Sequence, residues 1–179
     1  MNYEERKAIF DEEVKPHIPQ ALYDKMLNGG FLTQAASRKY HGAYSGGLFD
    51  HSLAVMRNLV ELTEKLSLKW QRPESPYIVG IAHDMCKIDA YIQDISGNFV
   101  WNRNQSYSNT MHGIKSVLIL RDILGDGYLT DEEESCIAYH MGAFMGELHW
   151  DKFTQGIKQF PNVLWTHTAD MEASHIQNI

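Results

Sequence analysis

The chain has 179 residues, of which 44% are hydrophobic and 22% are charged, and its formal net charge is −7 with neutral histidines. This composition is typical of one globular domain with a substantial core. The acidic balance disfavours a protein that holds a long nucleic acid mainly by electrostatic attraction.

The cysteines and the hydropathy of the chain indicate a reducing compartment. Cys86 and Cys136 both lie in apolar segments of helical character, and two cysteines alone do not form a disulfide framework. Residues 1–14 are charged and amphipathic, unlike a signal peptide, and no apolar run approaches the roughly 18 residues that a membrane span requires. We therefore expect a cytoplasmic protein with no membrane association, and a homo-oligomer remains open.

Helical periodicity dominates the chain, which has no repeat, low-complexity segment or linker. A loop rich in glycine and tyrosine, 40–47, precedes the longest predicted helix. Residues 97–107, GNFVWNRNQSY, contain a Gly-Asn turn and two short aromatic runs, so we expect a small β-hairpin there. Thr130 with Glu133 predicts a capping box. The sequence thus predicts an all-α domain with one hairpin, whose helices span 3–14, 19–28, 48–67, 76–88, 110–124, 131–141 and 161–177.

Five of these helices each direct one or two imidazoles or carboxylates inward. His51 shares the apolar face of its helix with Leu48 and Val55, and His83 and Asp84 interrupt the most apolar helix. Burying such groups unpaired costs on the order of several kcal/mol. The inward-facing set, with 28 to 32 residues from one helix to the next, is His51, His83, Asp84, His112, His140 and Asp170.

A divalent metal ion would relieve this cost, because imidazole nitrogen and carboxylate oxygen are ligands for first-row metals. A single inward histidine is more often an ordinary core residue, but an ordered set on five helices favours a metal site. The mixed nitrogen and oxygen set, without thiolate, argues against structural zinc. We expect Mn²⁺, Fe²⁺, Co²⁺, Ni²⁺, Mg²⁺ or catalytic Zn²⁺ at one site, and a second site stays open.

Five segments in this order resemble the motifs of the HD-domain metal-dependent phosphohydrolases: GGLFDHS, GIAHDMCKI, MHGIKS, AYHMG and HTADMEAS. The resemblance covers residues from about 40 to 174. The stretch HGAYSGGLFDHS, followed by a hairpin before MHG, is most similar to the branch of 3′→5′ exonucleases that trim nucleic-acid ends. The resemblance implies an HD-domain helical bundle, with residues 41–177 as the metal-binding core behind an N-terminal helical extension, residues 1–40.

The resemblance also implies a division of the ligands. His51, His83, Asp84 and Asp170 match the ligands of one metal. His112 and His140 match positions that hold a second metal in two-metal members, with Asp84 bridging. Two positions depart from the family pattern: Cys86 replaces the usual glycine, and Met141 stands where the family often has a second adjacent histidine.

Several further residues are candidates for substrate binding. By the resemblance, Lys87 contacts a substrate phosphate and His41 lies on the substrate side. Lys115 either binds phosphate or is a solvated helix residue, and Arg103 in the hairpin is a further candidate to bind phosphate. His167 is either a partner of the ligands, a ligand or a core histidine.

The hairpin aromatics, Trp101 and Tyr107, either stack on a base or pack on the bundle.

The implied chemistry is hydrolysis by metal-activated water. Asp84 orients the water or bridges two metals, and Lys87 stabilises charge in the transition state. We expect a phosphoester or phosphoanhydride in a nucleotide or short oligonucleotide, because about 40 residues before the core are too few for a nucleic-acid-binding barrel. The alternatives are a 3′→5′ exonuclease on longer nucleic acid, a di-iron oxygenase-like protein and a non-catalytic nucleotide sensor.

Overall fold

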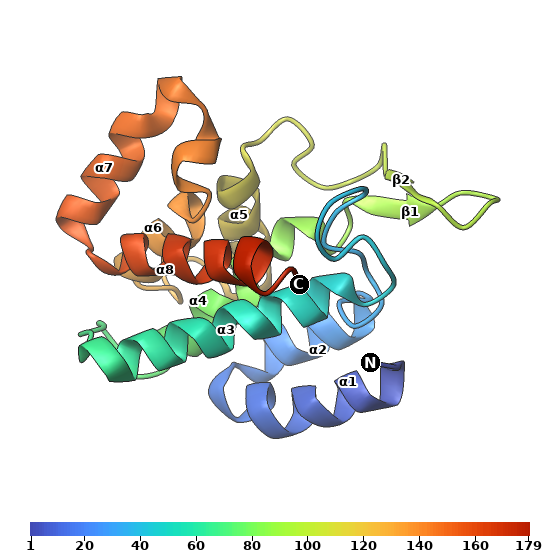
Figure 1. The fold of residues 1–179 in the computed structure, drawn as a ribbon, viewed down its shortest axis with the longest axis horizontal. Coiled ribbons are helices and arrows are strands. Elements are labelled where there is room, and N and C mark those ends of the chain that lie inside the picture. Colours follow the sequence, from blue (N-terminus) through green and yellow to red (C-terminus); the bar gives the residue numbers. More distant parts are fainter.

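The computed structural model describes the backbone of residues 1–179 and the side chains at every position except 143 and 148. It consists of helices and one small two-stranded antiparallel sheet, which confirms the all-α class with a hairpin (Figure 1). Within the described residues, no helix combines the length and apolar character needed to cross a membrane. The elements are α1 (Tyr3–Ile9), α2 (Gln20–Asn28), α3 (Gly47–Leu66), α4 (Ser75–Ala82), β1 (Tyr91–Gln93), β2 (Phe99–Trp101), α5 (His112–Leu124), α6 (Asp131–Tyr139), α7 (Trp150–Gln159) and α8 (Asn162–Met171).

The N-terminal segment packs into the main core and covers one side of α3 (Figure 1). Asn2 begins α1 with a capping box, and the helix continues into one π-helical turn, Phe10–Val14. The Phe10 ring stacks on Tyr23 with a centroid distance of 4.9 Å and meets Phe49 of α3 edge-on at 5.8 Å. These aromatic contacts join α1 and α2 to the helix that carries the first predicted ligand.

Close helix packing builds the centre of the molecule. Gly80 allows α4 to approach α3, because a Cβ at this position would lie 2.4 Å from the Cα of Met56. The predicted capping box of Thr130 and Glu133 begins α6. The Glu133 carboxylate is fully buried and accepts a hydrogen bond from Arg72 at 2.7 Å, which joins the start of α6 to the segment before α4.

The helix predicted at 76–88 ends at Ala82, earlier than expected. The Nδ1 atom of His83 donates to a main-chain carbonyl of α4 at 2.8 Å, and Asp84 has φ −103° and ψ 24°, outside the helical region. A 3₁₀ turn, Met85–Lys87, follows. Periodicity could not reveal this break, because the residues on both sides of it are apolar and buried.

The hairpin predicted at 97–107 is present but spans residues 91–101. The Gly-Asn pair belongs to the connecting turn. There the Asp94 carboxylate accepts hydrogen bonds from the main-chain N–H groups of Ser96 and Asn98 at 2.8 and 2.9 Å. The first strand therefore precedes the Gly-Asn pair, and the hairpin projects from the helical body (Figure 1).

The C-terminal part contains a helix, α7, that the sequence analysis did not predict. Its Gly156 packs against the ring of Tyr139, and this glycine weakens the helical signal of the segment. The helix predicted at 131–141 ends at Tyr139. The helix predicted at 161–177 corresponds to α8 and a following π-helical turn, Glu172–Ile176.

Candidate metal centre

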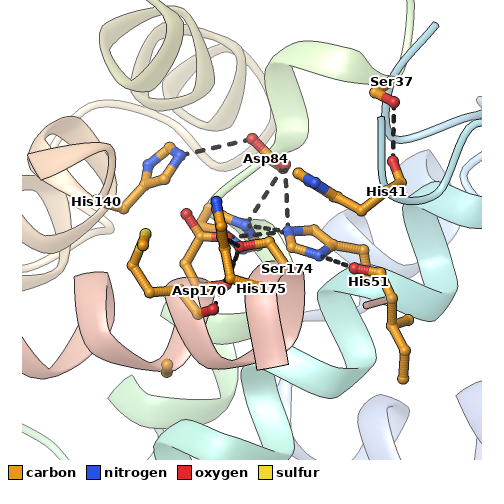
Figure 2. A network of polar contacts seen from close by, with 12 residues as sticks. Ser37, His41, His51, Asp84, His140, Asp170, Ser174 and His175 are labelled. Carbon is orange, nitrogen blue, oxygen red and sulfur yellow. Dashed lines mark hydrogen bonds and ion pairs between the residues drawn. The ribbon is translucent and has the colours of Figure 1, made fainter. Parts of the chain in front are cut away.

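The six predicted metal ligands lie close together, and His51, His83, Asp84 and His140 are buried. Figure 2 labels His51, Asp84, His140 and Asp170. The Nε2 atoms of His51 and His83 lie 3.3 Å apart. Asp170 Oδ1 lies 3.2 Å from His51 Nε2, and His140 Nε2 lies 3.6 Å from Asp84 Oδ1. The set comes from five elements: α3 supplies His51, the turn after α4 supplies His83 and Asp84, α5 begins with His112, His140 follows α6, and α8 supplies Asp170.

The carboxylate of Asp84 lies between two groups of histidines. Its Oδ2 atom is 3.7 Å from His51 Nε2 and 3.5 Å from His83 Nε2. Its Oδ1 atom faces the other way, toward His140 Nε2 and in hydrogen-bond contact with His112 Nε2. Asp84, the residue predicted to bridge two metals, thus lies between the two groups.

Hydrogen bonds orient three of the imidazole rings. The Nδ1 atoms of His51, His83 and His140 each lie within hydrogen-bond distance of a main-chain carbonyl, which makes Nδ1 the protonated nitrogen of the neutral ring. The Nε2 lone pairs therefore point into the cluster, as in metal-ligating histidines. The accepting oxygens, at 3.0, 2.8 and 2.7 Å in the same order, belong to Ile179, Gly80 and Ile137.

This donor set fits a divalent cation. With both rings neutral, the facing Nε2 atoms of His51 and His83 cannot hydrogen-bond to each other, yet they lie 3.3 Å apart. Two nitrogens bound tetrahedrally at about 2.0–2.1 Å would have roughly this separation. His140 Nε2 is buried and has no hydrogen-bond partner among the described residues. Burial tends to lower the pKa of His140, but the carboxylates of Asp84 and Asp170 outweigh it and raise the pKa, so these carboxylates favour a cation next to this ring.

The electrostatics of the cluster also favour a cation. Burial tends to raise the pKa of Asp84, but Lys87 and the histidines outweigh it and hold the pKa well below its usual range. Burial also tends to raise the pKa of Asp170, but the contact with His51 at 3.2 Å and the nearby rings of His83 and His140 outweigh it and lower the pKa. Complete burial lowers the pKa of His83 to about 3, so this ring is neutral at pH 7. Two ionised carboxylates thus face one lysine, which leaves negative charge for a metal to neutralise.

The cluster forms one wall of a cavity of about 480 Å³. Lys87 lies on this wall and donates from Nζ to Asp84 Oδ2 at 2.6 Å. His41 also lines the cavity, and its ring centroid lies 4.9 Å from that of His51. Burial, followed by repulsion from His51 and Lys87, lowers the pKa of His41 to about 4. The structure therefore brings both residues that the resemblance assigned to substrate next to the predicted ligands.

Lys115 and Arg103 lie outside this cavity. The Lys115 side chain is buried, and its Nζ donates to Asp89 Oδ1 and to Gln105 Oε1, both at 2.9 Å. Arg103 is exposed in the loop after β2. Neither of these two predicted phosphate contacts therefore faces the cluster directly.

Sequence reasoning missed part of the cavity wall. His175 follows Asp170 by five residues and lines the same cavity. The π-helical turn, Glu172–Ile176, places these two side chains on one side of the chain, which the 3.6-residue period of an α-helix does not predict. His167 lines no part of it. Its Nδ1 lies 2.8 Å from the carbonyl of His140 and thus positions the end of α6. The other unpredicted lining residues are Tyr40, Met141, Phe144, Met171 and Ser174.

Comparison of the chain with protein-family models, with curated proteins and with solved structures finds no match. The function must therefore be argued from the residues of the site.

Proposed function

We propose that the protein is a metal-dependent phosphohydrolase of the HD-domain superfamily that acts on a nucleotide or short oligonucleotide. One observation carries the proposal: four imidazoles and two carboxylates, from elements far apart in the sequence, converge on one largely buried cluster beside a lysine. The order and spacing of the sequence motifs support the same superfamily.

The residues divide into two candidate metal positions around Asp84. One position would use the imidazoles of His51 and His83 with the Asp170 carboxylate. The other position would use the imidazoles of His112 and His140. Nitrogen and oxygen donors suit Mn²⁺, Fe²⁺, Co²⁺, Ni²⁺ or Zn²⁺, and carboxylate oxygen suits Mg²⁺. When bound, such a cation lowers the pKa of a coordinated water and polarises a phosphoryl oxygen.

The protein side chains would orient the reactants. Asp84 is ionised at neutral pH, so a carboxylate oxygen can accept a hydrogen bond from the attacking water. Burial tends to lower the pKa of Lys87, but Asp84 outweighs it and raises the pKa, so Nζ is cationic at the cavity wall. From there it would bind a phosphate oxygen and stabilise negative charge in the transition state. His41 is neutral near pH 7 and would hydrogen-bond to substrate.

The size and rim of the cavity favour a small substrate. A volume of about 480 Å³ is in the range of small-molecule sites. Tyr40 and Phe144 are 82% and 61% exposed at its rim, where they offer aromatic surface to a base. The acidic net charge does not favour a long polyanion. Processive degradation of long RNA or DNA by the purified chain would contradict this choice.

The test combines elemental analysis of protein purified without chelator with a phosphate-release screen over nucleotides and short oligonucleotides in Mn²⁺, Co²⁺, Ni²⁺ or Mg²⁺. We expect one or two metals per chain and turnover. Asp84→Asn should lower kcat on the order of 100-fold or more, whereas Asp126→Asn, at an exposed loop position, should change it little.

Three outcomes would contradict the proposal. Two irons per chain without phosphate release would favour an oxygenase-like protein. Nucleotide binding without turnover in any metal would favour a sensor. No bound metal under any loading condition would mean that the cluster is only a buried polar core.

A further inference from the structure

A second cavity, of about 310 Å³, lies beside the first and is lined by the hairpin and α5. The two cavities share Lys87 and His112 as lining residues. Both side chains contact Asp84, Lys87 Nζ at 2.6 Å from Oδ2 and His112 Nε2 on Oδ1. The boundary between the cavities therefore lies at the residues that would bind the reacting phosphate.

The hairpin gives the second cavity an aromatic wall. Tyr91 and Trp101 face each other across the strand pair, with ring centroids 5.0 Å apart. The Trp101 side chain is 52% exposed, and the Arg38 guanidinium lies 5.2 Å from its ring centroid. Such a partly exposed indole beside a cavity is suited to stack on a flat ring, and stacking on aromatic side chains tolerates any base.

The charges in this cavity favour an uncharged ring over a second phosphate. Of the two lysines that line it, Lys115 is paired with Asp89 at 2.9 Å and Lys87 with Asp84 at 2.6 Å. Lys115 is thus neutralised by its own carboxylate, and Lys87 is held at the boundary with the first cavity, where the reacting phosphate would lie. Hydroxyl groups from the loop after β2, on Ser108 and Thr110, remain available along the wall to hydrogen-bond to a base or sugar.

We propose that this second cavity binds a nucleobase on the far side of the reacting phosphate, so that the preferred substrate is a phosphodiester joining two nucleosides. The inference rests on the proposed function. One nucleoside lies in the larger cavity, the phosphate lies at Asp84 and Lys87, and the second base stacks on Trp101. In the reaction, the water oxygen forms a new P–O bond and one ester P–O bond breaks. A water proton ends on the released hydroxyl, which gives one nucleoside and one nucleoside monophosphate.

The test measures binding apart from hydrolysis, on the metal-loaded full chain. Calorimetric titration compares a phosphorothioate-linked dinucleotide with the corresponding mononucleotide. We expect the dinucleotide to bind about tenfold more tightly, because one further base stacks on the protein. Trp101→Ala should remove this advantage and leave the mononucleotide affinity unchanged, while Trp101→Phe should retain most of it. Ile95→Ala, at the fully exposed tip of the same hairpin, is the matched control and should change neither affinity.

Kinetics separate this inference from the proposed function. Trp101→Ala should raise KM for a dinucleotide about tenfold, whereas Ile95→Ala should change neither this KM nor the turnover of p-nitrophenyl phosphate. Three outcomes would overturn the inference, even if a monoester is hydrolysed. The dinucleotide and the mononucleotide bind with equal affinity, Trp101→Ala weakens the binding of both equally, or neither of them binds. A Trp101-dependent dinucleotide advantage without any phosphate release would support the second cavity and overturn the hydrolase proposal.

Discussion

The imidazoles of His51, His83 and His140 have defined orientations because each Nδ1 is bound to a main-chain carbonyl. The residue types and their helical faces could be predicted from the sequence, since His51 lies in register with Leu48 and Val55. The orientation of the rings could not be predicted from the sequence, because the oxygen that accepts the hydrogen bond from His51 belongs to Ile179, 128 residues away. The position of His140 Nε2, which has no hydrogen-bond partner among the side chains that the structure describes, likewise depends on tertiary packing.

Metal binding should stabilise the folded chain, because these nitrogens are arranged only in the native state. At a metal concentration about 100 times Kd, we expect a gain of about 2.7 kcal/mol, seen as a rise in Tm that a chelator reverses. His140→Ala should reduce the rise, whereas His149→Ala, outside the cluster, should leave it intact. A Tm that does not respond to Mn²⁺, Co²⁺ or Ni²⁺ would contradict a metal site.

Asp89 should contribute to the acid sensitivity of the fold. Burial tends to raise the pKa of this carboxyl, but hydrogen bonds from the Ser106 main-chain N–H and from Lys115 outweigh it and lower the pKa. The unfolded chain, with a pKa of about 3.9, binds the proton more tightly. The stabilisation is therefore present above about pH 4 and is lost as the pH falls through the lower folded pKa.

Asp89→Asn should thus lower the free energy of unfolding at pH 7 and flatten its decline in acid, as measured by urea denaturation at several pH values. Asp126→Asn, at an exposed loop position, is the control. An equal flattening in both variants would show that Asp89 has no special role.

At the scale of elements, close helix contacts bring the ligands together. Gly80 allows α3 and α4 to pack closely, which places the Nε2 atoms of His51 and His83 3.3 Å apart. Gly113 does the same between α5 and α6, because a Cβ there would lie 2.3 Å from the Ala138 carbonyl oxygen. A glycine inside a helix lowers the helix propensity of its segment. The sequence alone therefore indicates only a weaker helix at these glycines and not a close helix contact.

Gly80→Ala should destabilise the protein by about 1–3 kcal/mol and lower its metal content, because the new Cβ meets the backbone of α3, which cannot move without separating the helices. Gly156→Ala is the matched control: its Cβ would meet mainly the Tyr139 side chain, which can shift. Thermal denaturation and elemental analysis of both variants test the difference. Equal effects on metal content would contradict a special role for the α3–α4 contact.

At the scale of the whole molecule, a buried ion pair fixes the N-terminal segment to the site. Arg6 of α1 binds Asp50 of α3 through two hydrogen bonds of 2.8 Å, and the Tyr44 hydroxyl donates to the same carboxylate at 3.0 Å. Both charged side chains are nearly inaccessible to solvent. Because Asp50 directly precedes His51, this contact positions the start of the helix that carries the first ligand.

Arg6→Met should cost about 3–5 kcal/mol of unfolding free energy, since it leaves the Asp50 charge buried with its main partner removed. The double variant Arg6→Met with Asp50→Leu should recover much of the loss. Arg57→Met breaks an exposed pair with Glu13 and should cost about 1 kcal/mol or less. Chemical denaturation of the three variants gives these values, and equal losses in Arg6→Met and Arg57→Met would contradict the structural role.

The sequence by itself determined the all-α class, the capping box at Thr130 and the inward set of histidines and aspartates, because periodicity and capping are local properties. Only the tertiary structure decided that α4 ends before His83, that α7 exists and that Lys115 is paired with Asp89. The tertiary structure also decided that two cavities lie side by side and share Lys87 and His112 as lining residues. These features depend on contacts between segments distant in the chain, and a pattern that reports which face of a helix is apolar does not report what that face touches.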